Sequence, residues 1–298
     1  METHRILRPL AAVACLFLSA AAAQAQVPQE VRSRIVEAHD SAWYESQAEA
    51  WQRVVQTTGA RDERAWRNYF EAARWAGRSA AFMDSLVARM GRSVPGSLTW
   101  HLCAYRNDPS PDSPHGAQIA ARAAQSDLRG EDANVALSYL LARGELCGGA
   151  SPCPTADSLL RRQWREGFYP EELLRFSYNQ LQGMADGAIY FANGDTDVFC
   201  KLLLQRAAGV HRDKLVVCTS FLFFPAYREA LFRALQIEPI PGRGRKPTAE
   251  DQAAYPGEVA AYVAEKTGRP VYISPWNRSY TRTIETKLYN EGLAFRYS

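Results

Sequence analysis

Residues 188–197 read Ala-Ile-Tyr-Phe-Ala-Asn-Gly-Asp-Thr-Asp, and this stretch decides the fold that the sequence predicts. Its first five residues form an unbroken apolar run, which is typical of a strand buried on both faces. The pattern recurs downstream, with apolar runs at 215–219 and 270–274 and helical patterns at 197–208, 225–236 and 250–267. Strands that alternate with helices through short links predict a parallel sheet with right-handed crossovers.

The end of the chain is expected to extend this sheet. Leu293, Phe295 and Tyr297 alternate with Ala294 and Arg296, which is the pattern of a strand with one wetter face. We therefore expect residues 185–298 to form a small three-layer α/β domain with a mostly parallel sheet.

The preceding part of the chain is expected to be helical. Between residues 31 and 183 apolar side chains recur at helical spacing, and glycines follow several of these stripes. Two similar helix ends, at Gly77 and Gly144, lie 144 − 77 = 67 residues apart, close to two repeats of about 34 residues. Residues 26–184 are therefore predicted to form an antiparallel array similar to tetratricopeptide repeats. The fold class expected for the chain is α + α/β.

Residues 1–25 have the three zones of a cleavable secretory signal. Arg5 and Arg8 supply the positive end, residues 10–22 supply a short apolar stretch, and Ala23-Gln24-Ala25 offers a cleavage site. Cleavage near Ala25 predicts an exported protein that is periplasmic or secreted. No later segment has the roughly 20 apolar residues that a transmembrane helix needs, so no transmembrane segment is expected in the mature chain.

Composition and cysteine spacing bear on the class of protein, on its partners and on a disulfide. With 47% apolar and 22% charged residues the chain is typical of globular proteins, and its net charge of +3 without a basic block predicts no nucleic-acid partner. Cys147 and Cys153 bracket a flexible segment, so in an oxidising compartment they are expected to form a disulfide; two unlinked loop thiols are the alternative.

The loop after the first apolar run is the candidate site. Open parallel sheets bind ligands outside the carboxyl ends of their strands, where Asn193, Gly194, Asp195 and Asp197 are expected to lie. Asp195 and Asp197 could hold a divalent cation such as Mg²⁺, Mn²⁺ or Ca²⁺ through oxygen ligands, or could bind sugar hydroxyls. Trp276 follows the third strand and could line the same crevice. In the alternative interpretation an aspartate only caps the next helix.

The same region resembles a known family. Residues 188–197, with Leu204-Gln205, Tyr227 and the closing segment Glu291-Gly292-Leu293-Ala294-Phe295-Arg296, carry the similarity. This region resembles the soluble, extracytoplasmic C-terminal region of bacterial multi-pass membrane proteins related to protein O-mannosyltransferases, which has an Asn-Gly-Asp-Asn-Asp loop after its first strand. The resemblance implies the fold and an envelope location, and it carries over no activity.

Three functions follow as hypotheses. The first is a non-catalytic envelope module that binds a protein or a glycan ligand. The second is a divalent-metal-dependent hydrolase or a glycosyl or phosphoryl transferase using the Asn193–Asp197 loop. Its Asp-x-Asp resembles the nucleophile motif of haloacid-dehalogenase-like phosphatases and the metal motif of nucleotide-sugar glycosyltransferases. The third is a purely structural domain.

Overall fold

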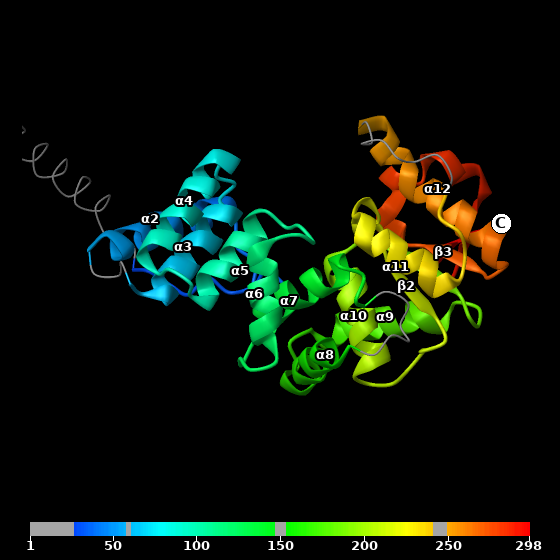
Figure 1. Cartoon of the computed structure of the whole chain (residues 1–298), viewed down its shortest axis with the longest axis horizontal. Helices are drawn as coiled ribbons and strands as arrows, with labels where there is room; N and C mark the ends of the chain where they lie inside the picture. The colour runs from blue at the N-terminus through cyan, green and yellow to red at the C-terminus, as the bar shows by residue number, and fades with distance from the viewer. Residues whose placement is uncertain (1–26, 58–60, 147–152, 241–248) are drawn as a thin grey trace, which may run out of the picture. The chain divides into compact units, whose positions relative to one another are not determined.

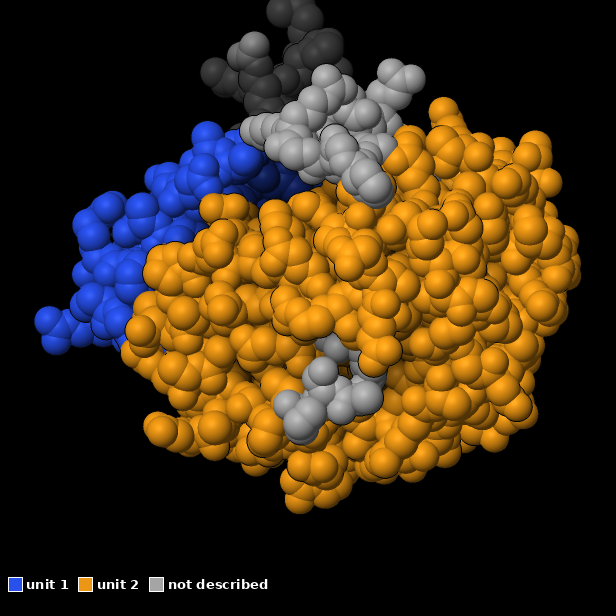
Figure 2. All heavy atoms as spheres, turned by 45° about the vertical axis from the view of Figure 1, so that its right-hand side comes forward, with its two compact units in different colours: residues 1–32, 39–100 blue, residues 33–38, 101–298 orange. Residues whose placement is uncertain are grey.

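A computed structural model describes residues 27–57, 61–146, 153–240 and 249–298. Its helices and strands are shown in Figure 1. Packing divides the chain into two compact units, one of Met1–Arg32 with His39–Trp100 and one of Ser33–Ala38 with His101–Ser298 (Figure 2). The predicted signal at residues 1–25 lies outside the described residues. Within the described part, no helix is long and apolar enough to cross a membrane.

The first unit is helical. It contains α2 (Ser41–Thr57), α3 (Glu63–Trp75), α4 (Ala80–Ser93) and the start of α5 (Leu98–Asn107). Asp62 begins α3 by accepting hydrogen bonds from the backbone N–H groups of Arg64 and Ala65, at 2.9 and 3.1 Å. The core is built from nearly inaccessible large side chains: Trp66, Tyr69, Phe70, Leu86 and Met90.

The second unit combines helices with a sheet. Its helices are α6 (Pro114–Ala123), α7 (Gly130–Ala142), α8 (Pro154–Glu166), α9 (Glu171–Gln182), α10 (Asp195–Arg206), α11 (Pro225–Leu235) and α12 (Ala249–Thr267). The sequence periodicity changes near residue 185, but packing groups the helices from His101 onward with the sheet. The predicted division into residues 26–184 and 185–298 therefore does not coincide with the two compact units. The repeat-like arrangement of the helices stays a prediction.

The sheet of the second unit is mixed. Its strands are β1 (Ile189–Ala192), β2 (Leu215–Cys218), β3 (Val271–Ile273), β4 (Leu288–Glu291) and β5 (Ala294–Tyr297), in the order β2-β1-β3-β5-β4. β1 pairs in parallel with β2 and β3, with Ile189 opposite Leu215 and Val271, and its four residues are all buried as the apolar run predicts.

The two C-terminal strands correct the expectation of a mostly parallel sheet. β5 pairs antiparallel with both β3 and β4. Only Gly292 and Leu293 link β4 to β5, and a two-residue link can join only antiparallel neighbours, since a parallel pair needs a crossover of a dozen residues or more. Gly292 has φ 62°, which fits the first central position of a type II′ hairpin turn. The chain is therefore mostly helical with a small mixed sheet.

Candidate functional site

The carboxyl ends of β2, β1 and β3 meet at one edge of the sheet, as parallel neighbours must. Each strand runs directly into a turn: Asn193-Gly194 before α10, the 3₁₀ helix Thr219–Phe223, and the 3₁₀ helix Pro275–Tyr280. Gly194 has φ 152° and ψ −174°, a conformation that only glycine adopts readily, so it sets the abrupt change from strand to helix. The sequence therefore builds a loop cluster where ligands bind in open α/β sheets.

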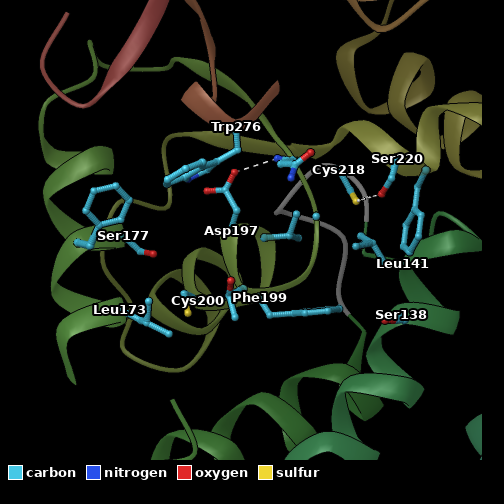
Figure 3. A pocket seen from close by; sticks show the side chains of 16 residues that line it. Ser138, Leu141, Leu173, Ser177, Asp197, Phe199, Cys200, Cys218, Ser220 and Trp276 are labelled. Carbon is cyan, nitrogen blue, oxygen red and sulfur yellow. Dashed lines mark hydrogen bonds between the residues drawn. The ribbon is translucent and has the colours of Figure 1, made fainter. Parts of the chain in front are cut away.

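A pocket of about 640 Å³ opens at this edge (Figure 3). We call it the strand-end pocket. It is lined by Ser138, Leu141, Leu173, Phe176, Ser177, Asn193, Gly194, Thr196, Asp197, Val198, Phe199, Cys200, Cys218, Ser220, Phe221 and Trp276. Two of its walls, α7 and α9, come from the helical part of the second unit, so the sheet edge alone does not make the pocket.

Asn277 ties the strand ends beside the pocket together. Its side chain is 1% exposed, and its Nδ2 donates to the carbonyl of Phe191 and to Oγ1 of Thr219, both at 2.9 Å. One amide on the turn after β3 therefore joins the ends of β1 and β2. Because these contacts are buried, they hold the pocket edge in one arrangement before any ligand arrives.

Asp197 is turned away from solvent toward its own helix. Its carboxylate is 9% exposed and contacts Nζ of Lys201, which is fully buried, at 2.6 Å. Its Oδ2 accepts from the backbone N–H of Asn193 at 2.8 Å, and its Oδ1 accepts from the hydroxyl of Tyr190 at 3.2 Å. Gln180 in turn donates to the Tyr190 hydroxyl at 3.2 Å. We call Asp197, Lys201, Tyr190 and Gln180 the Asp197 cluster.

The electrostatics of the cluster follow from burial. Burial lowers the pKa of Lys201, and the adjacent Asp197 carboxylate partly offsets that effect. Burial, together with the charge of Asp197, holds the pKa of Tyr190 well above its usual value, so this phenol is neutral and donates a hydrogen bond to the carboxylate. The Lys201 ammonium also lies 4.8 Å from the centre of the Tyr190 ring. Among the described side chains that line the pocket, the carboxylate is that of Asp197, and its compensating cation lies within hydrogen-bonding distance.

The pocket lining also contains aromatic rings and hydroxyl groups. Trp276 is 65% exposed, and Phe176 and Leu173 on α9 are partly exposed. Hydroxyls come from Ser138, Ser177, Thr196 and Ser220; the Ser220 oxygen lies 3.3 Å from the Cys218 sulfur (Figure 3). Burial raises the pKa of the Cys200 thiol to about 12, so this sulfur is protonated and is no nucleophile at neutral pH.

Most of the residues predicted for the site do meet there. Asn193, Gly194, Asp197 and Trp276 all line the strand-end pocket. Asp195 begins α10, but its side chain lies outside the described part of the structure.

Sequence reasoning missed the buried lysine and the hydroxyls of the wall. Lys201 carried a usable signal, because it follows Asp197 by one helical turn, the spacing at which opposite charges on a helix pair. Ser138 and Ser177 carried none, since only tertiary packing brings α7 and α9 to the sheet edge.

The predicted metal site does not gain support from Asp197. Both of its oxygens already accept hydrogen bonds from within the chain, as described above. Across the residues that the structure describes, no group of three or more His, Cys, Asp or Glu side chains is placed to hold a metal ion. A cation at this loop would therefore depend on Asp195.

The predicted disulfide cannot be placed within the described residues, because Cys147 lies outside them. Cys153 is buried at the start of α8, and burial raises the pKa of its thiol. The pairing of Cys147 with Cys153 stays a prediction.

Comparison with known proteins gives no match. No family model, no curated protein and no solved structure is significantly similar to this chain. The function therefore has to be argued from the site itself.

Proposed function

We propose that the protein is a non-catalytic binding protein of the bacterial envelope, and that the strand-end pocket takes an uncharged, glycan-like ligand. The observation that carries the proposal is the combination of an exposed Trp276 with pocket hydroxyls and a carboxylate compensated by buried Lys201. The predicted secretory signal and the resemblance to an extracytoplasmic family region support the envelope location.

The chemistry of the pocket favours a sugar. The C–H faces of a sugar ring pack on an aromatic ring, and its hydroxyls exchange hydrogen bonds with serine and threonine side chains. The exposed Trp276 supplies such a ring in the pocket lining, and Ser138, Ser177, Thr196 and Ser220 supply the polar groups. A charged ligand would find no free counter-charge among the described residues of the lining, because the Asp197 carboxylate is already paired with Lys201. Specific sites of this kind are mostly apolar with a few convergent polar groups.

The test is calorimetry of the full chain against neutral oligosaccharides of increasing length. Trp276→Ala should weaken binding of a bound sugar about tenfold, the loss expected for one aromatic platform. Trp164 is a matched control, because it is also an exposed tryptophan, at 42%, and does not line the pocket. Trp164→Ala should leave the affinity unchanged. If no neutral sugar binds, or if both variants lose affinity equally, the proposed ligand class is wrong.

Calorimetry also distinguishes the metal-dependent enzyme from the sugar-binding protein. Titration with Mg²⁺, Mn²⁺ and Ca²⁺ should give no heat that depends on the Asn193–Asp197 loop. Binding of one of these cations that disappears in Asp195→Asn would replace the present proposal with a metal-dependent enzyme.

A further inference from the structure

Two exposed apolar side chains of α9 line the strand-end pocket and have no role in the sugar site described above. Leu173 and Phe176 are 36% and 38% exposed. They are three residues apart in one helix, so they lie on the same face. We call these two side chains the α9 patch. A single exposed leucine is ordinary on a protein surface, whereas exposed apolar side chains gathered in a pocket mark a binding surface.

The hydroxyl groups that a ligand can reach come from other elements. Figure 3 shows Leu173 on one side of the pocket and Ser138 and Ser220 on the opposite side. Ser138 belongs to α7 and Ser220 to the 3₁₀ helix after β2, and both side chains are at least partly exposed. Ser177, also on α9, is only 3% exposed and forms a hydrogen bond with the Cys200 thiol. The pocket is therefore amphipathic, with accessible hydroxyls opposite an accessible apolar surface.

A sugar ring alone matches only part of this lining. Its hydroxyls need hydrogen-bond partners, and a hydroxyl that loses its water against Leu173 or Phe176 gains none, which weakens binding. The pocket volume of about 640 Å³ lies within the range for sites that take drug-sized ligands, and it exceeds the space of one sugar ring. An aliphatic group attached to the sugar would cover the α9 patch and remove its apolar area from water.

We propose that the ligand of the strand-end pocket is a neutral glycoside that carries an aliphatic group. The sugar ring contacts Trp276 and the hydroxyls of Ser138 and Ser220, and the aliphatic group covers the α9 patch. This inference rests on the proposed sugar-binding function and narrows its ligand class from sugars to amphiphilic glycosides. A soluble alkyl glycoside and a membrane glycolipid share this chemistry.

The first experiment measures how affinity depends on the length of the aliphatic group. The full chain is titrated by calorimetry with the methyl and butyl β-glycosides of glucose, galactose and mannose. A fully buried methylene contributes about 0.8 kcal/mol, which is about fourfold in affinity, and a methylene covered on one side contributes about twofold. The added methylenes of the butyl group should therefore tighten binding of the best-bound sugar by about 8-fold to about 64-fold.

The outcomes separate this inference from the proposed function. If the methyl glycosides bind and the butyl glycosides bind no more tightly, the inference is overturned and sugar binding stands. If none of the glycosides binds, sugar binding itself is refuted and the inference falls with it. Butan-1-ol that binds as tightly as the best butyl glycoside also overturns the inference, because the sugar then contributes nothing.

The second experiment removes the α9 patch. Leu173→Gln/Phe176→Gln replaces two exposed side chains with a polar residue that favours helix, so the fold should be kept. The preference for the butyl over the methyl glycoside should fall below about threefold, because no apolar surface remains for the chain to cover. The matched control is Tyr178→Gln/Leu293→Gln, whose side chains are 39% and 41% exposed and do not line the pocket; it should keep the full preference. An equal loss in both double variants, or no loss in the first, overturns the inference.

A vesicle assay distinguishes the two sources of the ligand. The full chain is sedimented with phosphatidylcholine vesicles, with and without a diacylglycerol glycoside of the best-bound sugar. Binding that requires the glycolipid and is lost in Leu173→Gln/Phe176→Gln supports the inference and assigns the site to a membrane glycolipid. A butyl preference without binding to either vesicle supports it and assigns the site to a soluble glycoside. Equal binding to both vesicles overturns it, because the apolar side chains then only adsorb to lipid.

Discussion

The buried pair of Asp197 and Lys201 offers the sharpest test of the described site. The variants are Asp197→Asn, Lys201→Met and the double variant. The two charged groups are 2.6 Å apart, with side chains 9% and 0% exposed, so removing either one leaves the other charged and buried. Each single change should lower the free energy of unfolding of the second unit by about 3 kcal/mol or more. The double variant leaves no charge behind and should cost at least about 2 kcal/mol less than the sum of the two.

The pH dependence of these variants has a definite sign. Burial already lowers the pKa of Lys201, and Asp197 is the largest effect opposing that shift, so the pKa falls further in Asp197→Asn. A folded-state pKa below the unfolded value means that folding is penalised at low pH and that the penalty shrinks as pH rises through the folded pKa. Asp197→Asn should therefore cost less at pH 9.5 than at pH 6.5. Lys201→Met has no amine to neutralise and should show no such recovery.

The measurement is urea unfolding at several pH values, combined with hydrogen exchange of the β1 amides to identify the transition of the second unit. Additive single changes, within about 0.5 kcal/mol, would show that the two side chains are not coupled. A cost of Asp197→Asn that is independent of pH would refute the burial of a charged Lys201.

Three further changes test other parts of the second unit. His101 and His115 lie with Nδ1 atoms 2.9 Å apart, and burial is the largest cause that lowers both pKa values. On acidification the unfolded chain takes up protons at these histidines at about pH 6.5, before the folded chain does. Protonation therefore favours unfolding, so the thermal unfolding midpoint should fall as the pH falls, and His115→Gln should reduce that fall. Asn277→Ala should lower the free energy of unfolding by about 1–3 kcal/mol in urea, because it removes two buried hydrogen bonds; a loss below about 0.5 kcal/mol would show that these two hydrogen bonds contribute little. Gly116→Ala places a Cβ 2.2 Å from Cδ2 of the Tyr139 ring and should destabilise by about 1–3 kcal/mol, which a raised midpoint would contradict.

The central strands could be predicted from the sequence because their burial leaves an unmistakable pattern. Residues 188–192 are apolar without interruption, since β1 is covered on both faces and flanked by two other strands. β4 has no such pattern: Leu-Tyr-Asn-Glu at Leu288–Glu291 is half-exposed at the sheet edge, so hydrophobicity does not mark it. The antiparallel end of the sheet was missed for this reason, although Gly292 offered a hairpin signal.

The candidate site was predictable in position and less so in its chemistry. Position follows from topology, because Asn193 and Trp276 each follow a parallel strand and parallel strands end at the same edge. The orientation of a carboxylate depends on its partners, and Asp197 turns inward because Lys201 and Tyr190 satisfy it there. Composition cannot show which of two aspartates in a short loop will be buried.

The sheet order has a consequence for how the chain reaches its native state. β1 lies at the interior of the sheet between β2 and β3, and Ile189 pairs with Val271, which is 271 − 189 = 82 residues later. Contacts over such sequence distances close slowly, because the intervening chain must first be brought together. During synthesis one edge of this apolar strand therefore stays unpaired until residues 271–273 have been made. An apolar strand with an unpaired edge can pair with other chains, so aggregation during folding is most favoured in that interval.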